Sequence, residues 1–177
     1  PVRAPAVLRE DTSVQNDRCW SIARCNVPFP LTLHCYDGCC AMTPTPYIIF
    51  QGQCRVAMTA YAAIFGGEIT MMMTGEDMPG MDVDEDKKNW IMHSELAFDG
   101  GVLMASDDMM GSNPAMAGCS VMMEMASVDT AKEAYDQLSK DGQVIMPFAP
   151  TPWSEGFAML TDRFGTSWMI SGPASME

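Results

Sequence analysis

The stretch GFAMLTDRFGTSWMI, residues 156–170, reads as two short apolar strands joined by a turn at Phe-Gly-Thr-Ser. A similar stretch, ELAFDGGVLMASD, occupies residues 95–107, and its Asp99-Gly100 pair is typical of a tight β-hairpin. Two copies of one hairpin in a single chain predict a repeated structural unit. If the unit is repeated, the residues that precede each hairpin should also follow the same order of strands and helices.

The first hairpin closes a series of elements with a regular order. Residues 46–50, PYIIF, predict a buried strand, and residues 54–67 carry apolar side chains at helical spacing before a Gly-Gly stop. A strand over residues 68–73 follows, and then an acidic loop over residues 74–89 that is rich in Gly, Pro and charge. The hairpin over residues 90–107 completes a βαβββ unit.

The same order recurs in the second half of the chain. Residues 119–126 predict a strand, and residues 129–142 predict a helix with Asp129 as its N-cap and Gly142 as its stop. Residues 143–152 predict a strand that breaks at its prolines, and the second hairpin then closes the unit.

The repeat predicts an α+β fold of two βαβββ modules, residues 42–107 and 119–171, joined by a linker over residues 108–118 and followed by a tail over residues 172–177. One module alone has too little apolar surface for an independent core. Two modules side by side give a curved eight-stranded mixed sheet, with helices outside and a concave cup inside. Ligands favour such concavities.

Residues 1–41 differ in composition from the rest of the chain. They hold five of the seven cysteines, whereas all 19 methionines lie from Met42 onward. A zinc module is one alternative, but the C-x₂-C pairs of structural zinc sites are absent around His34 and Cys35. A disulfide framework would require export, and no signal-peptide layout is visible. We expect an irregular extension outside the core, with Met42 as the natural start.

The charge of the chain excludes several classes of partner. Ten basic and 23 acidic residues give a formal net charge of −13. Such a chain is poorly suited to bind nucleic acid or an anionic membrane surface. No apolar run is long enough to cross a membrane. We expect a cytoplasmic protein with neither nucleic acid nor membrane as a partner.

Three stretches resemble a known family: TPYIIFQGQCRVAMTAYAAIFGGEI (residues 45–69), MHSELAFDGGVLMASD (92–107) and MPFAPTPWSEGFAMLTDRFGTSWMI (146–170). They look like the PhnB-like branch of the vicinal oxygen chelate superfamily, which includes glyoxalase I, bleomycin-resistance proteins and extradiol dioxygenases. The resemblance covers residues 44–171 and implies paired βαβββ modules and a homodimer. Members are often labelled demethylubiquinone methyltransferase-like, but the sequence lacks the strand, glycine-rich turn and helix that build a dinucleotide site.

Metal-dependent members of the superfamily take His and Glu ligands from the first and last strands of each module, and the metal stabilises an enolate or a similar anion. In this chain those strands offer only Asp107, Cys119 and Glu124 as ligands. The last strand holds Trp168 followed by Met-Ile where relatives carry an acidic ligand. We therefore expect no cofactor, with a divalent metal as the alternative.

The expected ligand-binding residues are apolar or aromatic, with one hydroxyl: Phe50, Met104, Met122, Trp153, Ser154, Phe157 and Trp168. As a pocket wall they suit a flat or amphipathic organic ligand. The alternative is that the aromatic residues among them fill the core.

The candidate catalytic residues are His93, Glu95 and Glu124. His93 and Glu95 are two positions apart on an expected strand, so both side chains lie on one face, either as an acid/base pair or as a plain polar pair. Two further sites have open interpretations. Cys54 starts a helix, where it is either a nucleophile or a buried thiol. Asp162 is expected to be a turn residue with an exposed ion pair to its neighbour.

Three hypotheses for function follow. The first is a small-molecule-binding protein of the glyoxalase/bleomycin-resistance type, holding an apolar or aromatic ligand in the cup without metal. The second is a glyoxalase-like lyase or isomerase that uses a metal or the acid/base residues. The third is a dimeric protein that acts through its interface.

Overall fold

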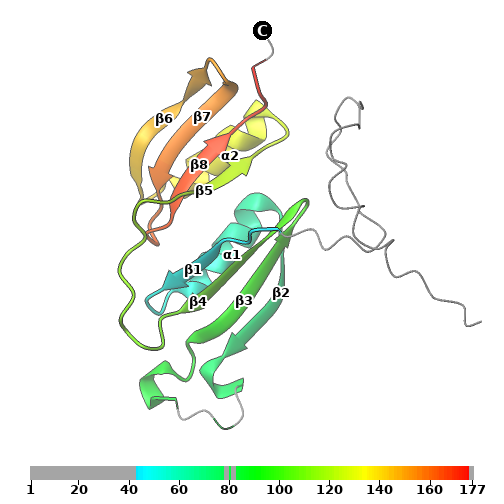
Figure 1. Ribbon diagram of the computed structural model, residues 1–177. Coiled ribbons are helices and arrows are strands. Elements are labelled where there is room, and N and C mark those ends of the chain that lie inside the picture. Colours follow the sequence, from blue (N-terminus) through cyan, green and yellow to red (C-terminus); the bar gives the residue numbers. More distant parts are fainter. Residues whose placement is uncertain (1–42, 78–79, 81–82, 176–177) are drawn as a thin grey trace, which may run out of the picture. The chain divides into compact units, whose positions relative to one another are not determined.

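The computed structural model describes residues 43–77, 80 and 83–175, so the expected extension over residues 1–41 lies outside the described residues. Figure 1 shows two modules that follow one another along the chain. The first module consists of β1 (Tyr47–Phe50), α1 (Cys54–Phe65), β2 (Glu68–Thr74), β3 (Ile91–Phe98) and β4 (Gly101–Asp107). The loop between β2 and β3 holds two short 3₁₀ turns, Gly75–Asp77 and Glu85–Lys87.

The second module repeats this order. It consists of β5 (Val121–Glu124), α2 (Val128–Leu138), β6 (Gln143–Thr151), β7 (Ser154–Thr161) and β8 (Ser167–Ser171). The strand orders of the two sheets are β1-β4-β3-β2 and β5-β8-β7-β6, and only the pairs β1–β4 and β5–β8 are parallel. The predicted α+β fold of two βαβββ modules is confirmed. Hydrogen bonding divides the eight strands into two four-stranded sheets instead of joining them in one.

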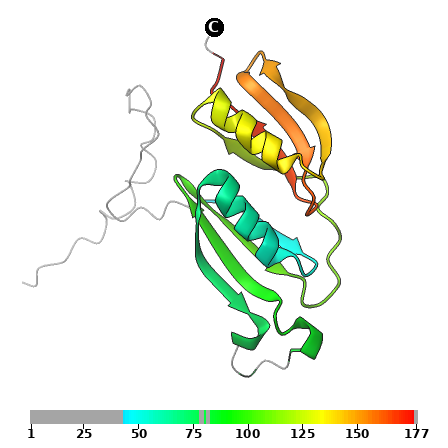
Figure 2. The same ribbon diagram turned by 180° about the vertical axis from the view of Figure 1, so that it is seen from behind.

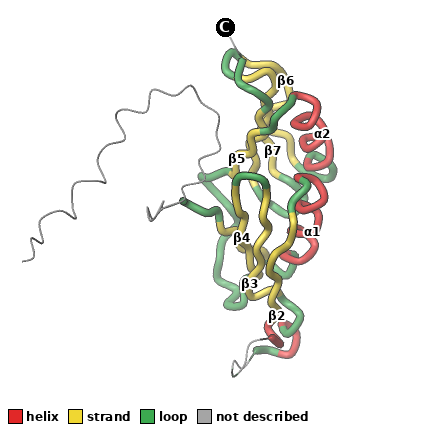
Figure 3. The backbone as a smooth tube through the Cα atoms, turned by 90° about the vertical axis from the view of Figure 1, so that its right-hand side faces the viewer, coloured by secondary structure: helices red, strands yellow, loops and turns green. Residues whose placement is uncertain are grey.

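Each sheet has one face covered by a helix and one open face without a helix. Figure 2 shows both helices in front of the strands, and Figure 3 shows them on the same side in profile. In β1, Ile48 and Phe50 are buried on the helix side, whereas Tyr47 and Ile49 are exposed. The period-2 alternation of a strand therefore assigns alternate residues to the core and to the open face.

Helix α1 buries Cys54, Ala57, Met58 and Tyr61, which share one face because they are separated by three or four positions. Gly66 ends the helix in the left-handed conformation, with φ of 69°, which a residue without a Cβ adopts at little cost. The predicted helix and its glycine stop are both present.

The start of α1 is capped from a distant strand. Its own N-cap residue makes no side-chain hydrogen bond. Instead, Asp107 at the end of β4 accepts from the backbone N–H of Cys54 through Oδ1 (2.9 Å) and from that of Ile91 through Oδ2 (2.8 Å). One carboxylate therefore fixes the start of α1 and the start of β3 to the end of β4. Its negative charge also interacts favourably with the positive end of the helix dipole.

Two sequence expectations for the second module were wrong in detail. Helix α2 begins at Val128, and its N-cap is Ser127, whose hydroxyl accepts from Thr130 N–H (3.2 Å), so Asp129 lies inside the first turn. Strand β6 also continues past Pro147 instead of breaking there. Since β6 is an edge strand with register shifts along β7, the missing proline N–H costs no interior ladder bond.

The two modules share one hydrophobic core. Tyr61 of α1 donates its hydroxyl to Asp162 Oδ2 (2.6 Å), in the turn between β7 and β8. The Trp168 indole packs edge-on against Tyr61 at 5.0 Å between ring centroids and donates Nε1–H to the same carboxylate oxygen (2.8 Å). Contacts between residues this far apart in sequence join the modules through a buried polar centre.

No helix in the described part of the chain could cross a membrane.

Candidate functional site

A row of side chains crosses the open face of the first sheet. Strand register places Tyr47 of β1 beside Met104 of β4, Met104 beside Glu95 of β3, and Glu95 beside Met71 of β2. Neighbouring positions on one sheet face lie close enough for their side chains to contact. His93 is on the same face, next to Met73 of β2.

Three of these polar side chains form a hydrogen-bonded chain. The Tyr47 hydroxyl lies 3.3 Å from His93 Nδ1, and His93 Nε2 lies 3.2 Å from Glu95 Oε1. The Tyr47 and His93 rings stack with their centroids 5.8 Å apart. The side chains of His93 and Glu95 are 28% and 29% exposed, so the chain is partly shielded from water. His93 and Glu95 therefore share one face of the strand, as predicted, and the structure adds a hydrogen bond between them and a third member, Tyr47.

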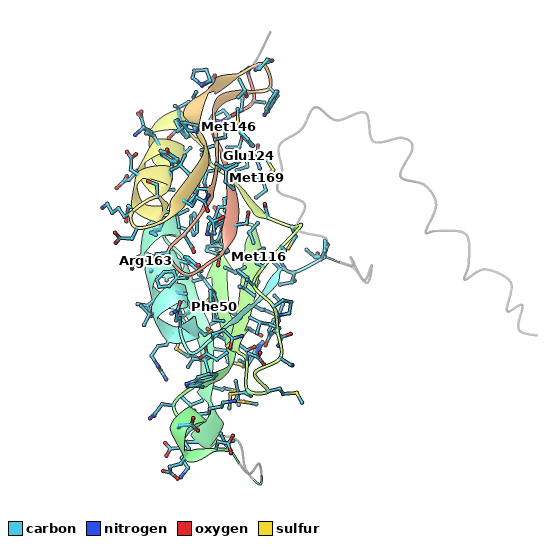
Figure 4. All side chains as sticks on the ribbon, turned by 90° about the vertical axis from the view of Figure 1, so that its left-hand side faces the viewer. Phe50, Met116, Glu124, Met146, Arg163 and Met169 are labelled. Carbon is cyan, nitrogen blue, oxygen red and sulfur yellow. The ribbon has the colours of Figure 1, made fainter. Side chains whose placement is uncertain are left out.

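The open face of the second sheet has a matching row in which every member is a methionine. Register joins Met122 of β5 to Met169 of β8, Met169 to Met159 of β7, and Met159 to Met146 of β6. Figure 4 labels two of them, Met146 and Met169, together with Glu124. The second sheet therefore presents thioethers where the first presents a phenol and a carboxylate.

Glu124, the third candidate catalytic residue, lies apart from the other two. It is exposed at the end of β5, and within the described ranges no hydrogen bond or ion pair joins it to His93. Glu124 and Met122 instead line a groove of about 260 Å³, whose other wall includes Val102 and Pro46. That volume is just below the range of about 300–1,000 Å³ typical of small-molecule pockets.

The structure separates the seven expected ligand-binding residues into different environments. Phe50 and Trp168 are 3% and 0% exposed and belong to the core on the helix side. Trp168 pairs in register with the buried Val121, which places it on the face opposite Met122. Both residues therefore agree with the alternative interpretation, in which these aromatic side chains fill the core.

The other five expected residues do not form one cup either. Ser154 is buried, and its hydroxyl is bonded to the carbonyl oxygens of Gly156 (2.9 Å) and Gly172 (3.2 Å), so it is occupied by the backbone. Trp153 is 58% exposed and contacts Phe157 edge-on. Met104 and Met122 lie on the open faces of different sheets.

The donors for a family-type metal site do not converge. Asp107 is 4% exposed, and both its oxygens already accept backbone N–H groups. Within residues 43–77, 80 and 83–175, no group of three or more His, Cys, Asp or Glu side chains is placed to hold a metal ion. A divalent ion in an open catalytic site needs about three protein ligands, so these residues do not fit one.

Cys54 is a buried thiol. Its side chain is fully inaccessible, and burial, followed by the negative charge of Asp107, raises its pKa from the ordinary value of 9.0 to about 12. The thiolate is the nucleophilic form, so this residue is unsuited to nucleophilic catalysis at neutral pH.

Sequence reasoning missed two residues. Tyr47 lies 46 positions from His93 and meets it only because β1 and β3 flank β4. Asp162 was expected in an exposed ion pair, but it is 6% exposed and accepts from Tyr61, Trp168, and the backbone N–H groups of Phe164 and Thr166. The Arg163 guanidinium lies over the Phe164 ring instead, 4.7 Å from its centroid.

Known proteins share this architecture and sequence pattern. Residues 42–171 match the family described as 3-demethylubiquinone-9 3-methyltransferase. Protein YjdN of Escherichia coli strain K12 is 27% identical over 139 residues, which cover 73% of this chain and 95% of YjdN.

Two solved structures extend the comparison. Protein PA1353 from Pseudomonas aeruginosa is 36% identical, with a TM-score of 0.69, over 75% of this chain and 98% of its own. The PhnB protein from Bacillus cereus has the same fold at 23% identity, with a TM-score of 0.62, over 74% of this chain and 99% of its own. The chain therefore belongs to the 3-demethylubiquinone-9 3-methyltransferase family.

Proposed function

We propose that this protein binds an apolar or aromatic small molecule against the open face of its first sheet, without a metal ion. The observation that carries the proposal is the hydrogen-bonded chain of Tyr47, His93 and Glu95, set among the partly exposed side chains of Met71 and Met104. A few fixed polar groups on an apolar surface are typical of small-molecule sites. Methionine side chains adapt their shape to different apolar ligands.

A thermal-shift screen of hydrophobic and aromatic metabolites, with and without chelator, tests the proposal. Aromatic compounds should raise the melting temperature equally in both conditions, because ligand that binds only the native state stabilises it. Met104→Ala should weaken the shift, whereas Trp153→Ala, which removes an exposed ring at the far end of the second sheet, should leave it unchanged. A hit that requires zinc, nickel or iron would overturn the metal-free part, and no hit across a broad library would overturn binding itself.

We also propose that the protein forms a homodimer through the open face of its second sheet and the groove beside it, which leaves the ligand site on the first sheet uncovered. The supporting observation is a set of large apolar side chains, each more than a third exposed: Val102, Met122 and Met146. Exposed apolar surface of this kind typically marks an interaction site. A second copy would cover it and would deepen the groove beside Met122.

Sedimentation velocity tests the dimer. Wild-type protein at micromolar concentration should sediment as a dimer, and Met122→Lys should shift it toward monomer because a charge at an apolar contact is costly to bury. Val56→Lys is the matched control, since Val56 is equally exposed, at 58% against 55% for Met122, but lies on α1. A monomeric wild-type protein would contradict the proposal.

A further inference from the structure

We infer that the site accepts a hydrogen bond from its ligand, and that the ligand is an apolar ring system carrying a neutral hydroxyl or amino donor. This inference rests on the proposed function and adds the chemical class of the molecule bound. Glu95 fixes the direction of every hydrogen bond in the chain that ends at Tyr47.

An ionised carboxylate can only accept hydrogen bonds. His93 Nε2, at 3.2 Å from Glu95 Oε1, must therefore carry the proton of that contact. In a neutral imidazole one ring nitrogen is protonated and the other is an acceptor. His93 Nδ1 is then the acceptor, and the Tyr47 hydroxyl at 3.3 Å donates to it.

The phenol oxygen of Tyr47 has consequently used its only proton. A hydroxyl has one donor and two acceptor lone pairs, so the lone pairs are what remain for another molecule. Tyr47 is 48% exposed, which makes this oxygen accessible from the open face. The chain Glu95, His93, Tyr47 therefore presents an acceptor, and a ligand must supply the donor.

The surroundings narrow the ligand class further. The residues in register around the chain are methionines, namely Met71, Met73 and Met104, and they suit an apolar skeleton. The carboxylate of Glu95 and the net charge of −13 disfavour an anionic ligand. The ligand must therefore supply a hydrogen-bond donor, have an apolar skeleton and carry no negative charge. A phenol, an aromatic amine or an apolar alcohol meets all three conditions, whereas a carboxylate or a phosphate does not.

The experiment compares 2-naphthol with 2-methoxynaphthalene, which have the same ring system but differ in the one donor proton. Isothermal titration measures the affinity of the protein for each compound. We expect the wild-type protein to bind the naphthol about fivefold to tenfold more tightly, the usual effect of one hydrogen bond. Tyr47→Phe should abolish the difference while leaving binding of the methyl ether intact.

Two variants test whether the preference for the naphthol depends on the direction of the hydrogen bonds or only on the presence of a phenol. Glu95→Gln lets the side-chain amide donate to His93, so the imidazole can reverse its proton and free the Tyr47 hydroxyl to donate. The preference for the naphthol should then shrink. Tyr135→Phe, which removes a phenol from α2, is the matched control and should leave the preference unchanged.

The outcomes distinguish this inference from the proposed function. Equal affinity of wild-type protein for both compounds, or tighter binding of the methyl ether, would overturn the donor preference and leave apolar binding in place. Failure of both compounds, together with an empty metabolite screen, would overturn the proposed function. A preference that survives Tyr47→Phe would place the acceptor elsewhere and would also refute the inference.

Discussion

The open faces of the two sheets differ although their backbones follow the same plan. In each module a central position of the last strand is occupied by a methionine, Met104 or Met169, with register neighbours on both sides. Around Met104 the neighbours are Tyr47 and Glu95, whereas around Met169 they are Met122 and Met159. The repeated fold therefore supplies two equivalent rows of side chains, and of these two rows only the first carries polar groups that could orient a ligand.

The two modules also differ in the role of a buried aspartate. Each has a buried aspartate beside its last strand. Asp107 accepts two backbone N–H groups within its own module. Asp162 accepts two backbone N–H groups and also the side chains of Tyr61 and Trp168, so it connects the modules. The first module holds the candidate site, and the second provides the contact that fixes the two modules together.

Register makes Leu103 the counterpart of Trp168, and both are buried. Trp168→Ala should lower the free energy of unfolding by about 4–5 kcal/mol and Leu103→Ala by about 3 kcal/mol, because each leaves a cavity in the core. The tryptophan should cost more since Asp162 also loses its indole donor. Urea unfolding measures both variants, and equal losses would mean that the two core positions contribute alike.

The two buried aspartates give the next effect. Asp162→Ala should cost about 3 kcal/mol and Asp107→Ala about 2 kcal/mol, because each leaves buried N–H or O–H donors without acceptors. The difference follows from the larger number of donors at Asp162. Unfolding monitored by tryptophan fluorescence and by circular dichroism checks both. A larger loss at Asp107 would mean that the cap of α1, and not the junction of the modules, limits stability.

The free cysteines in the described residues contrast in a similar way, with Cys54 buried and Cys119 exposed. Native protein at neutral pH should react with iodoacetamide at Cys119 while Cys54 stays unmodified, and peptide mass spectrometry separates the two sites. Because burial raises the pKa of Cys54 from 9.0 to about 12, its contribution to stability is complete below pH 9.

That contribution is lost as the pH rises from 9.0 toward 12, since the thiol of the unfolded chain ionises first. Cys54→Ala should flatten the decline in stability over this range. An unchanged decline would show that other groups control it.

The smallest effect concerns the two methionines at equivalent positions. If the ligand binds the first sheet, Met104→Ala should weaken binding of 2-naphthol about threefold to fivefold through lost apolar contact. Met169→Ala should change it by less than a factor of two, within the usual scatter for residues that touch no ligand. Titration calorimetry measures both. A larger loss of affinity for Met169→Ala than for Met104→Ala would mean that the ligand binds the second sheet.

Much of this arrangement could be predicted from the sequence. Hydrophobic periodicity and the repeated hairpin predicted both βαβββ modules, and the spacing of His93 and Glu95 predicted their shared face, because these signals are local. The position of Trp168 was harder to predict. Alternation separates the two faces of a strand but does not say which face a helix covers, so the indole was assigned to a cup although it lies in the core.

The remaining features depend on pairing between distant strands. Tyr47 meets His93 across the sheet, and Tyr61 meets Asp162 over a separation of 101 residues. A β-strand sequence does not specify its partner or its register, so neither contact could be derived from composition or spacing. The polar chain on the first sheet and the polar centre between the modules both required the structure.

The carboxylate of Asp107 has a consequence for how the first module opens. Because it holds the amides of Cys54 and Ile91 at the same time, release of the end of β4 frees the start of α1 and the start of β3 together. These amide protons should exchange with deuterium in a single cooperative step, although they are 37 positions apart in the sequence. The strand that bears Met104 and the strand that bears His93 therefore belong to one unit of local unfolding, and the candidate site forms or disappears as a whole.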